Sequence, residues 1–260
     1  MRQQKGSPTD YQQPEWEVFM SYEFDQQQVP MPLSEAEMTQ TFVAAMQKVY
    51  TWMALGLLTT AISAVAVFLI PPLARFIFGS RFVFYGLLIG ELVLVIAASR
   101  VAMKVSAEKG LALFFVYAFV NGLTLSFIFL VYDLGTIWLA FGSTAVLFGI
   151  MSVVGYTTKE DLSGWGGFLM MGLVGLIVAS IANMFFANSA LDWIVTYAGI
   201  LIFLGLTVYD TNRIKKLTYT ALATGQTDVA ARMGVIGALH LYLDFINLFL
   251  YILRLVGRRR

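Results

Sequence analysis

Long apolar segments, each about as long as a bilayer is thick, constrain this chain more than any other feature. An α-helix needs about 20 predominantly apolar residues to cross the hydrocarbon core. The segments that meet this requirement are Val49–Ile70, Phe82–Met103, Leu111–Tyr132, Thr136–Tyr156, Trp165–Ala187, Leu191–Tyr209 and Met233–Leu255. They are continuously apolar rather than alternating, which argues against a membrane β-barrel. We therefore predict an all-α, multi-pass protein of the cell membrane with seven transmembrane helices.

The composition agrees with a membrane protein and excludes several kinds of site. Hydrophobic residues make up 58% of the chain and charged residues 13%, whereas soluble domains have about 25% charged residues. The net charge of +1 argues against a nucleic-acid binder driven by bulk charge. With no cysteine and one histidine, His240, the chain has no thiolate chemistry, no disulfide and no multi-histidine metal site. We expect a lipid bilayer around the protein, and neither a cofactor nor a nucleic-acid partner.

The apolar segments divide the chain into a membrane domain and two polar ends. Residues 1–43 are expected to be a polar, disordered tail, residues 44–257 the seven-helix domain and residues 258–260 a basic C-terminal tail. Thr211 to Arg232 is the longest predicted connection, with a turn at Gly225. Loop Lys and Arg residues favour an N-terminus inside the cell. Seven full spans then place the C-terminus outside, whereas a re-entrant last segment would place both ends inside.

A polar stripe runs along the last apolar segment. Its members follow one another at spacings of three or four residues: Gly237, His240, Asp244, Asn247, Tyr251 and Arg254. This spacing puts them on one face of a helix. Because lipid cannot solvate the stripe, it should face other helices, and we predict that the last helix is central. The stripe can serve as interhelical hydrogen-bonding contacts or as the wall of an ion path, and the pattern alone leaves both open.

Two aspartates lie in the last two apolar segments. Asp210 directly follows the sixth segment and Asp244 lies in the middle of the seventh. An ionisable residue inside a membrane costs about 2.5–3.5 kcal/mol and usually faces a cavity or a partner. Antiparallel packing could bring the two carboxyls together, and two buried carboxyls cannot both ionise cheaply. We hypothesise that they approach within hydrogen-bonding reach and share a proton; alternatively, Asp210 is a solvated acid facing Arg213 or Lys215.

The second predicted helix carries two more ionisable residues. Glu91 lies near mid-membrane, either as a protonated packing residue or as part of a polar interior. Arg100, toward the inner end, can extend to the surface or pair with Asp210. Asn121 and Asn183 are expected to form interhelical hydrogen bonds. Glycine pairs at one-turn spacing predict close helix contacts at Gly86 with Gly90 and at Gly172 with Gly175.

Four short motifs resemble a known family. Gly205-Leu206-Thr207-Val208-Tyr209-Asp210-Thr211 is similar to the end of the sixth helix in the Bax inhibitor-1 family, and Leu241-Tyr242-Leu243-Asp244-Phe245-Ile246-Asn247-Leu248-Phe249 to its last helix. Asn121-Gly122-Leu123-Thr124 and Gly155-Tyr156-Thr157-Thr158-Lys159 resemble parts of its third and fourth helices. The resemblance extends from about Ala44 to Leu255, which is nearly all of the membrane domain.

This resemblance implies a seven-helix fold with a central last helix and a pH-sensitive calcium leak. The aspartate pair that controls the leak matches Asp210 and Asp244, which would bind calcium transiently as the permeant ion. Arg100 matches a latch residue of the second helix by position alone. Further candidates for the lining of the path are Glu91, His240, Asn247 and Tyr251.

Other functions remain open at this point. The family also includes members tied to cell-death control and to regulation of a membrane protease, so a non-conducting regulator with a membrane protein partner is the main alternative. Intramembrane aspartyl proteases also carry Tyr-Asp on one helix and Asp on the next. They place Gly-x-Gly before the second aspartate, where this chain has Leu241-Tyr242-Leu243, and we therefore expect no enzyme. A retinal-type receptor would need a lysine in the last segment, which has none.

Overall fold

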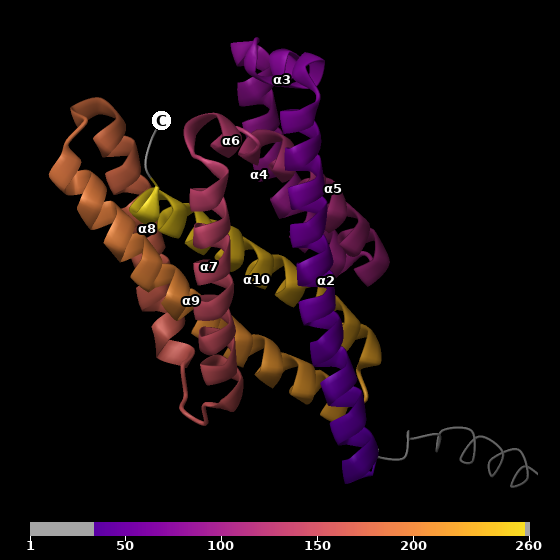
Figure 1. The fold of residues 1–260 in the computed structure, drawn as a ribbon. Helices are drawn as coiled ribbons and strands as arrows, with labels where there is room; N and C mark the ends of the chain where they lie inside the picture. The colour runs from indigo at the N-terminus through magenta and orange to yellow at the C-terminus, as the bar shows by residue number, and fades with distance from the viewer. Residues whose placement is uncertain (1–33, 258–260) are drawn as a thin grey trace, which may run out of the picture.

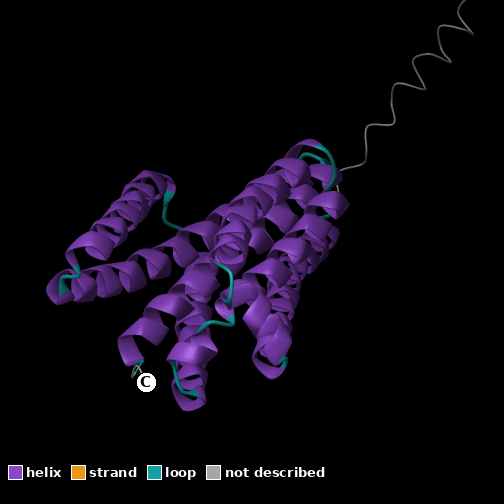
Figure 2. Ribbon diagram, turned by 90° about the horizontal axis from the view of Figure 1, so that it is seen from above, coloured by secondary structure: helices purple, strands orange, loops and turns teal. Residues whose placement is uncertain are grey.

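A computed structural model describes residues 34–257, and throughout this range helices are joined by short loops (Figure 2). Seven of its helical segments are long and apolar enough to cross a membrane, which confirms the predicted fold class. The helices are α2 (Glu35–Leu69), α3 (Pro71–Phe78), α4 (Arg81–Lys104), α5 (Ala107–Leu125), α6 (Ile128–Val131), α7 (Leu134–Thr157), α8 (Ser163–Phe186), α9 (Ser189–Ala223) and α10 (Thr227–Val256). The described chain starts and ends at opposite ends of the bundle (Figure 1).

Helix α10 is the central helix, as predicted. In its most apolar window 67% of the residues are buried, against 44% or fewer in each of the other six spans. It crosses the middle of the bundle and packs against α2, α4, α5, α7 and α9 (Figure 1). Leu239, Leu241, Leu248 and Leu253 are fully enclosed on its apolar sides. The other helices therefore cover both the apolar faces of α10 and much of its polar stripe.

Helix α2 begins earlier than expected. Its N-terminus is closed by a capping box, in which the Ser34 hydroxyl accepts from the Glu37 N–H at 3.3 Å and the Glu37 carboxylate accepts from the Ser34 N–H at 3.0 Å. Met38 and Phe42 then pack against a small apolar cluster of α9 and α10. Residues 35–43 are thus helical, which corrects the predicted boundary of the tail. Residues 1–33 and 258–260, the rest of the predicted tails, lie outside the described residues.

The predicted long connection from Thr211 to Arg232 is wrong. Helix α9 continues to Ala223 and α10 starts at Thr227, so the connection is a short turn over residues 224–226, in which Gly225 has φ +69°. This additional part of α9, residues 211–223, packs against other helices. Thr211, Ile214 and Thr218 are buried on its inner side.

Close helix contacts occur at glycines other than the predicted pairs. Gly155 of α7 lies so near Val208 and Thr211 of α9 that an added Cβ would overlap them. Gly86, Gly90 and Gly175 have open space instead, whereas Gly172 of α8 does approach Ile202 of α9. The contact at Gly155 fixes α7 against the stretch of α9 that carries Asp210.

Candidate functional site

A cavity of about 500 Å³ lies between α8, α9 and α10. Five of the residues selected from the sequence line it: Asp210, His240, Asp244, Asn247 and Tyr251. Except for Ser180 of α8, the remaining wall is apolar. On α8, only Leu169 and Leu176 are buried, so this helix forms a thin outer wall. The structure therefore places most of the predicted polar path in one chamber.

Asp244 is the innermost acid of this chamber. Its residue is only 4% exposed, and its Oδ2 atom is buried without a hydrogen-bond partner among residues 34–257. A buried carboxylate oxygen without a partner is costly, so the site favours a proton or a cation beside it. Its place in the middle of α10, with apolar residues on both sides, holds the side chain inside the bundle.

Asp210 lines the same chamber as Asp244. Its Oδ2 atom is 3.7 Å from His240 Nδ1, and Arg213 is a further charge that acts on it. The charge of Asp210 also acts on Asp244, so the two carboxyls are electrostatically connected. The hypothesis of a directly shared proton stays a prediction. His240 is the nearest ionisable partner of Asp210.

The polar stripe continues from this chamber to the C-terminal end of α10. Asn247 and Tyr251 also line a second cavity of about 260 Å³, and Arg254 lines its far end. There Arg254 forms an ion pair with Asp192 in the first turn of α9, and the Asn183 amide of α8 donates to the same carboxylate at 3.3 Å. The stripe thus connects two cavities and ends at an ion pair. Asp192 was not selected from the sequence, because an acid in the first turn of a helix is common for its dipole alone.

Of the two alternatives for Arg100, the structure shows a side chain exposed at the surface and not a pair with Asp210. It is exposed on α4, which packs mainly against α5, and no ion pair joins it to any residue in the range 34–257. The alternative of a pair rested on Arg100 and Asp210 lying near the same membrane face. The structure shows that two residues at a similar depth in the membrane can lie on helices that are not neighbours in the bundle.

Glu91 belongs to a different polar network and does not line the aspartate cavity. Its carboxylate accepts from the Asn121 amide at 3.2 Å and from the Thr124 hydroxyl. The Tyr242 hydroxyl donates to Asn121 Oδ1 at 2.9 Å and lies 2.6 Å from Thr60 Oγ1. These contacts tie α2, α4, α5 and α10 together. Tyr242 precedes Asp244 by two positions and therefore points to the opposite side of α10. This spacing could have identified Tyr242, from the sequence, as a polar residue on the side facing away from the aspartate.

The donor set of the cavity fits a weak cation site. Within residues 34–257 there is no group of three or more His, Cys, Asp or Glu side chains that could hold a metal ion. Asp210 and Asp244 supply carboxylate oxygens, the ligands that calcium prefers. A tightly held calcium ion takes six to eight oxygens, so two carboxylates suit transient binding.

Comparison with known proteins shows to which family the sequence belongs. The family model described as "Inhibitor of apoptosis-promoting Bax1" matches residues 41–260. The "Inner membrane protein YbhL" of Escherichia coli K12 is 44% identical over 221 residues, which cover 85% of this chain and 93% of the relative. An "Uncharacterized protein" of Borreliella burgdorferi is 43% identical, covering 82% of this chain and 91% of the relative. Another from Deinococcus radiodurans is 37% identical, covering 90% and 97%.

The family match spans the whole membrane domain, including both aspartate motifs. Together with the seven membrane-spanning helices, it makes this chain a multi-pass protein of the cell membrane. The chain belongs to the Bax inhibitor-1 family.

Proposed function

We propose that this protein is a calcium leak whose ion path runs through the cavity between α8, α9 and α10. The observation that carries the proposal is the buried, unpartnered oxygen of Asp244 in a chamber shared with Asp210. Interhelical hydrogen-bonding contacts would give each buried polar atom a partner, as they do around Glu91. Conduction requires that the ion bind favourably enough to enter the path and weakly enough to leave it. Two carboxylates in a half-apolar chamber meet both conditions.

The same groups make the leak sensitive to pH. The titratable side chains that line the chamber are Asp210, His240, Asp244 and Tyr251, with Arg213 acting on Asp210 from outside it. Acidification protonates carboxylates, so the chamber loses negative charge. Because calcium is attracted by ionised oxygens, its flux should fall as the pH falls.

Calcium uptake by proteoliposomes tests the ion path directly. Asp244→Asn and Asp210→Asn each remove one carboxylate from the chamber while keeping its volume, so both should lower uptake at neutral pH. Asp161→Asn is the matched control, because Asp161 is an exposed acid of the α7–α8 loop, paired with Lys216 at 3.4 Å. Equal uptake in all three variants and the wild type would overturn the proposed path.

A non-conducting regulator is the second candidate, and the description of the matching family favours it, since that description names an inhibitor of apoptosis-promoting Bax1. Such a protein would act by binding a membrane protein partner. It would show no calcium uptake in proteoliposomes that contain only this chain. Uptake that depends on Asp244 would distinguish the leak from it.

A further inference from the structure

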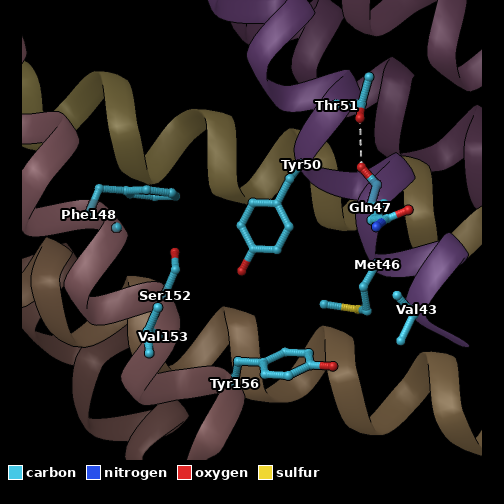
Figure 3. A pocket seen from close by; sticks show the side chains of 10 residues that line it. Val43, Met46, Gln47, Tyr50, Thr51, Phe148, Ser152, Val153 and Tyr156 are labelled. Carbon is cyan, nitrogen blue, oxygen red and sulfur yellow. Dashed lines mark hydrogen bonds between the residues drawn. The ribbon is translucent and has the colours of Figure 1, made fainter. Parts of the chain in front are cut away.

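A second large cleft, of about 750 Å³, opens between the first half of α2 and the last half of α7 (Figure 3). It shares no lining residue with the aspartate cavity. Val43, Met46, Phe148 and Val153 form much of its apolar wall. The α7 side of the cleft belongs to the apolar segment Thr136–Tyr156, whereas its α2 side begins before the apolar segment Val49–Ile70. The cleft therefore lies toward one end of the membrane domain.

Two hydroxyl groups point into this apolar cleft. Ser152 is 6% exposed, and its Oγ atom is buried without a hydrogen-bond partner in the described part of the chain. The Tyr50 hydroxyl points into the same space from the opposite helix (Figure 3). An unpartnered buried hydroxyl costs about 1–3 kcal/mol, so a ligand that brings a hydrogen-bond acceptor to this depth would be favoured.

A cation lies next to Tyr156, at one mouth of the cleft. Lys215 of α9 donates from its Nζ to the carbonyl oxygens of Tyr156 at 2.7 Å and Thr158 at 3.3 Å, and it lies 5.7 Å from the centre of the Tyr156 ring. Tyr156 itself lines the cleft. Helix α2 has 35 residues and is therefore about 52 Å long, so its first turns extend beyond a hydrocarbon core of about 30 Å. Because Tyr156 also ends the apolar segment Thr136–Tyr156, we expect this mouth at the level of the lipid headgroups.

We propose that this cleft binds one anionic glycerophospholipid from the surrounding leaflet. Its phosphate lies near Lys215, its ester carbonyls accept from Ser152 and Tyr50, and one acyl chain packs against the apolar wall. The depths agree with this order, because Ser152 is one helical turn, about 6 Å, further into the membrane than Tyr156. The chain then continues past Phe148 toward Leu58, which lies on the same side of α2 and is 54% exposed.

Native mass spectrometry of the purified full-length protein tests this site, with phosphatidylglycerol and phosphatidylcholine of identical acyl chains as the added lipids. The wild type should retain one phosphatidylglycerol about tenfold more tightly than phosphatidylcholine, the range of one charge-assisted contact. Val153→Trp fills the cleft from an exposed position and should abolish retention. Val154→Trp is the matched control, because Val154 is also exposed but does not line the cleft, and it should bind as the wild type does.

Two further comparisons separate the parts of the site. Lys215→Ala should remove the preference for phosphatidylglycerol, whereas Lys216→Ala, whose side chain faces Asp161 instead, should keep it. Ether-linked phosphatidylglycerol lacks the ester carbonyls and should bind the wild type as weakly as the ester lipid binds Ser152→Ala. Unchanged retention in Val153→Trp, or equal affinity of the wild type for both headgroups, would overturn the proposal. A protein dimer that forms in the wild type and is lost in Val153→Trp would assign the cleft to a second copy and also overturn it.

Discussion

At the scale of single residues, buried polar atoms on two faces of α10 differ in whether they have hydrogen-bond partners. Tyr242 is saturated by Asn121 and Thr60, whereas Asp244 Oδ2 has no partner within residues 34–257. The first arrangement holds helices together, and under the proposed function the second leaves a site for a mobile ion. The sequence motif that contains both residues would then combine a structural side chain with a functional one.

The structural role of Tyr242 predicts a loss of stability. Tyr242→Phe removes a hydroxyl from a fully buried network, leaving Asn121 and Thr60 short of a partner, and should cost about 1–3 kcal/mol of unfolding free energy. Tyr197→Phe is the control, since Tyr197 is 52% exposed and its change should stay within about 0.5 kcal/mol. Thermal unfolding in detergent measures both. A Tyr242→Phe protein as stable as the control variant would show that the network is not a structural anchor.

Arg100 provides a residue-scale test of the geometry. Its side chain is exposed and forms no ion pair with the residues in the range 34–257, so Arg100→Ala should leave calcium uptake at the wild-type level. A latch at this position, which the family resemblance implies, would give the reverse result, because its loss would raise the leak. An increased leak in this variant would mean that Arg100 reaches Asp210 in a conformation other than this one.

At the scale of helices, the ends of α8, α9 and α10 meet at the ion pair of Arg254 with Asp192. Both side chains are about one third exposed, at 32% and 34%, so breaking the pair should cost well below the 3–5 kcal/mol of a fully buried pair. Asp192→Asn should therefore leave the protein folded while it loosens the C-terminal end of the polar stripe. We expect higher calcium uptake at neutral pH.

Asp228→Asn serves as the comparison for this variant, because Asp228 also lies in the first turn of its helix but at the other end of α10. Its uptake should equal that of the wild type. If Asp192→Asn lowers uptake or leaves it unchanged, the ion pair does not close the path.

At the scale of the whole molecule, hydropathy was enough to predict seven spans, and the periodicity of the last segment was enough to predict a central helix. Four of the six stripe residues line one cavity, and Asp210 of α9 lines it with them. The inner half of α9 was missed because its polar composition resembles a loop. The buried positions Thr211, Ile214, Thr218 and Ala221, spaced three or four apart, carried a helical signal that hydropathy alone does not detect.

The partners of single side chains could not be predicted in the same way. Arg100 and Glu91 were assigned by depth in the membrane, but contacts depend on the order of the helices around the bundle, which a single sequence does not encode locally. For the same reason Asp192, far from Arg254 in the chain, was not recognised as its partner. The position of a residue along its helix therefore predicted its depth in the membrane, whereas the packing of the helices determined which side chains it contacts.

The pH response of the whole protein should come from the chamber and not from surface acids. Hydrogen bonds from the Ser163 backbone and hydroxyl, together with the Lys216 ammonium, hold the pKa of Asp161 below its ordinary value of 3.8. A lowered pKa leaves this carboxylate ionised at every pH above that value, so its contribution is lost only in stronger acid. Asp161→Asn should therefore keep the complete pH dependence between mildly acidic and neutral conditions.

Calcium uptake into proteoliposomes, measured from mildly acidic to neutral pH, is the most direct test of the leak. We predict that uptake by the wild type rises toward neutral pH, that Asp161→Asn follows the same curve, and that Asp244→Asn stays low and nearly flat across it. Uptake by the wild type that does not change with pH, or an Asp244→Asn curve that coincides with that of the wild type, would contradict the account.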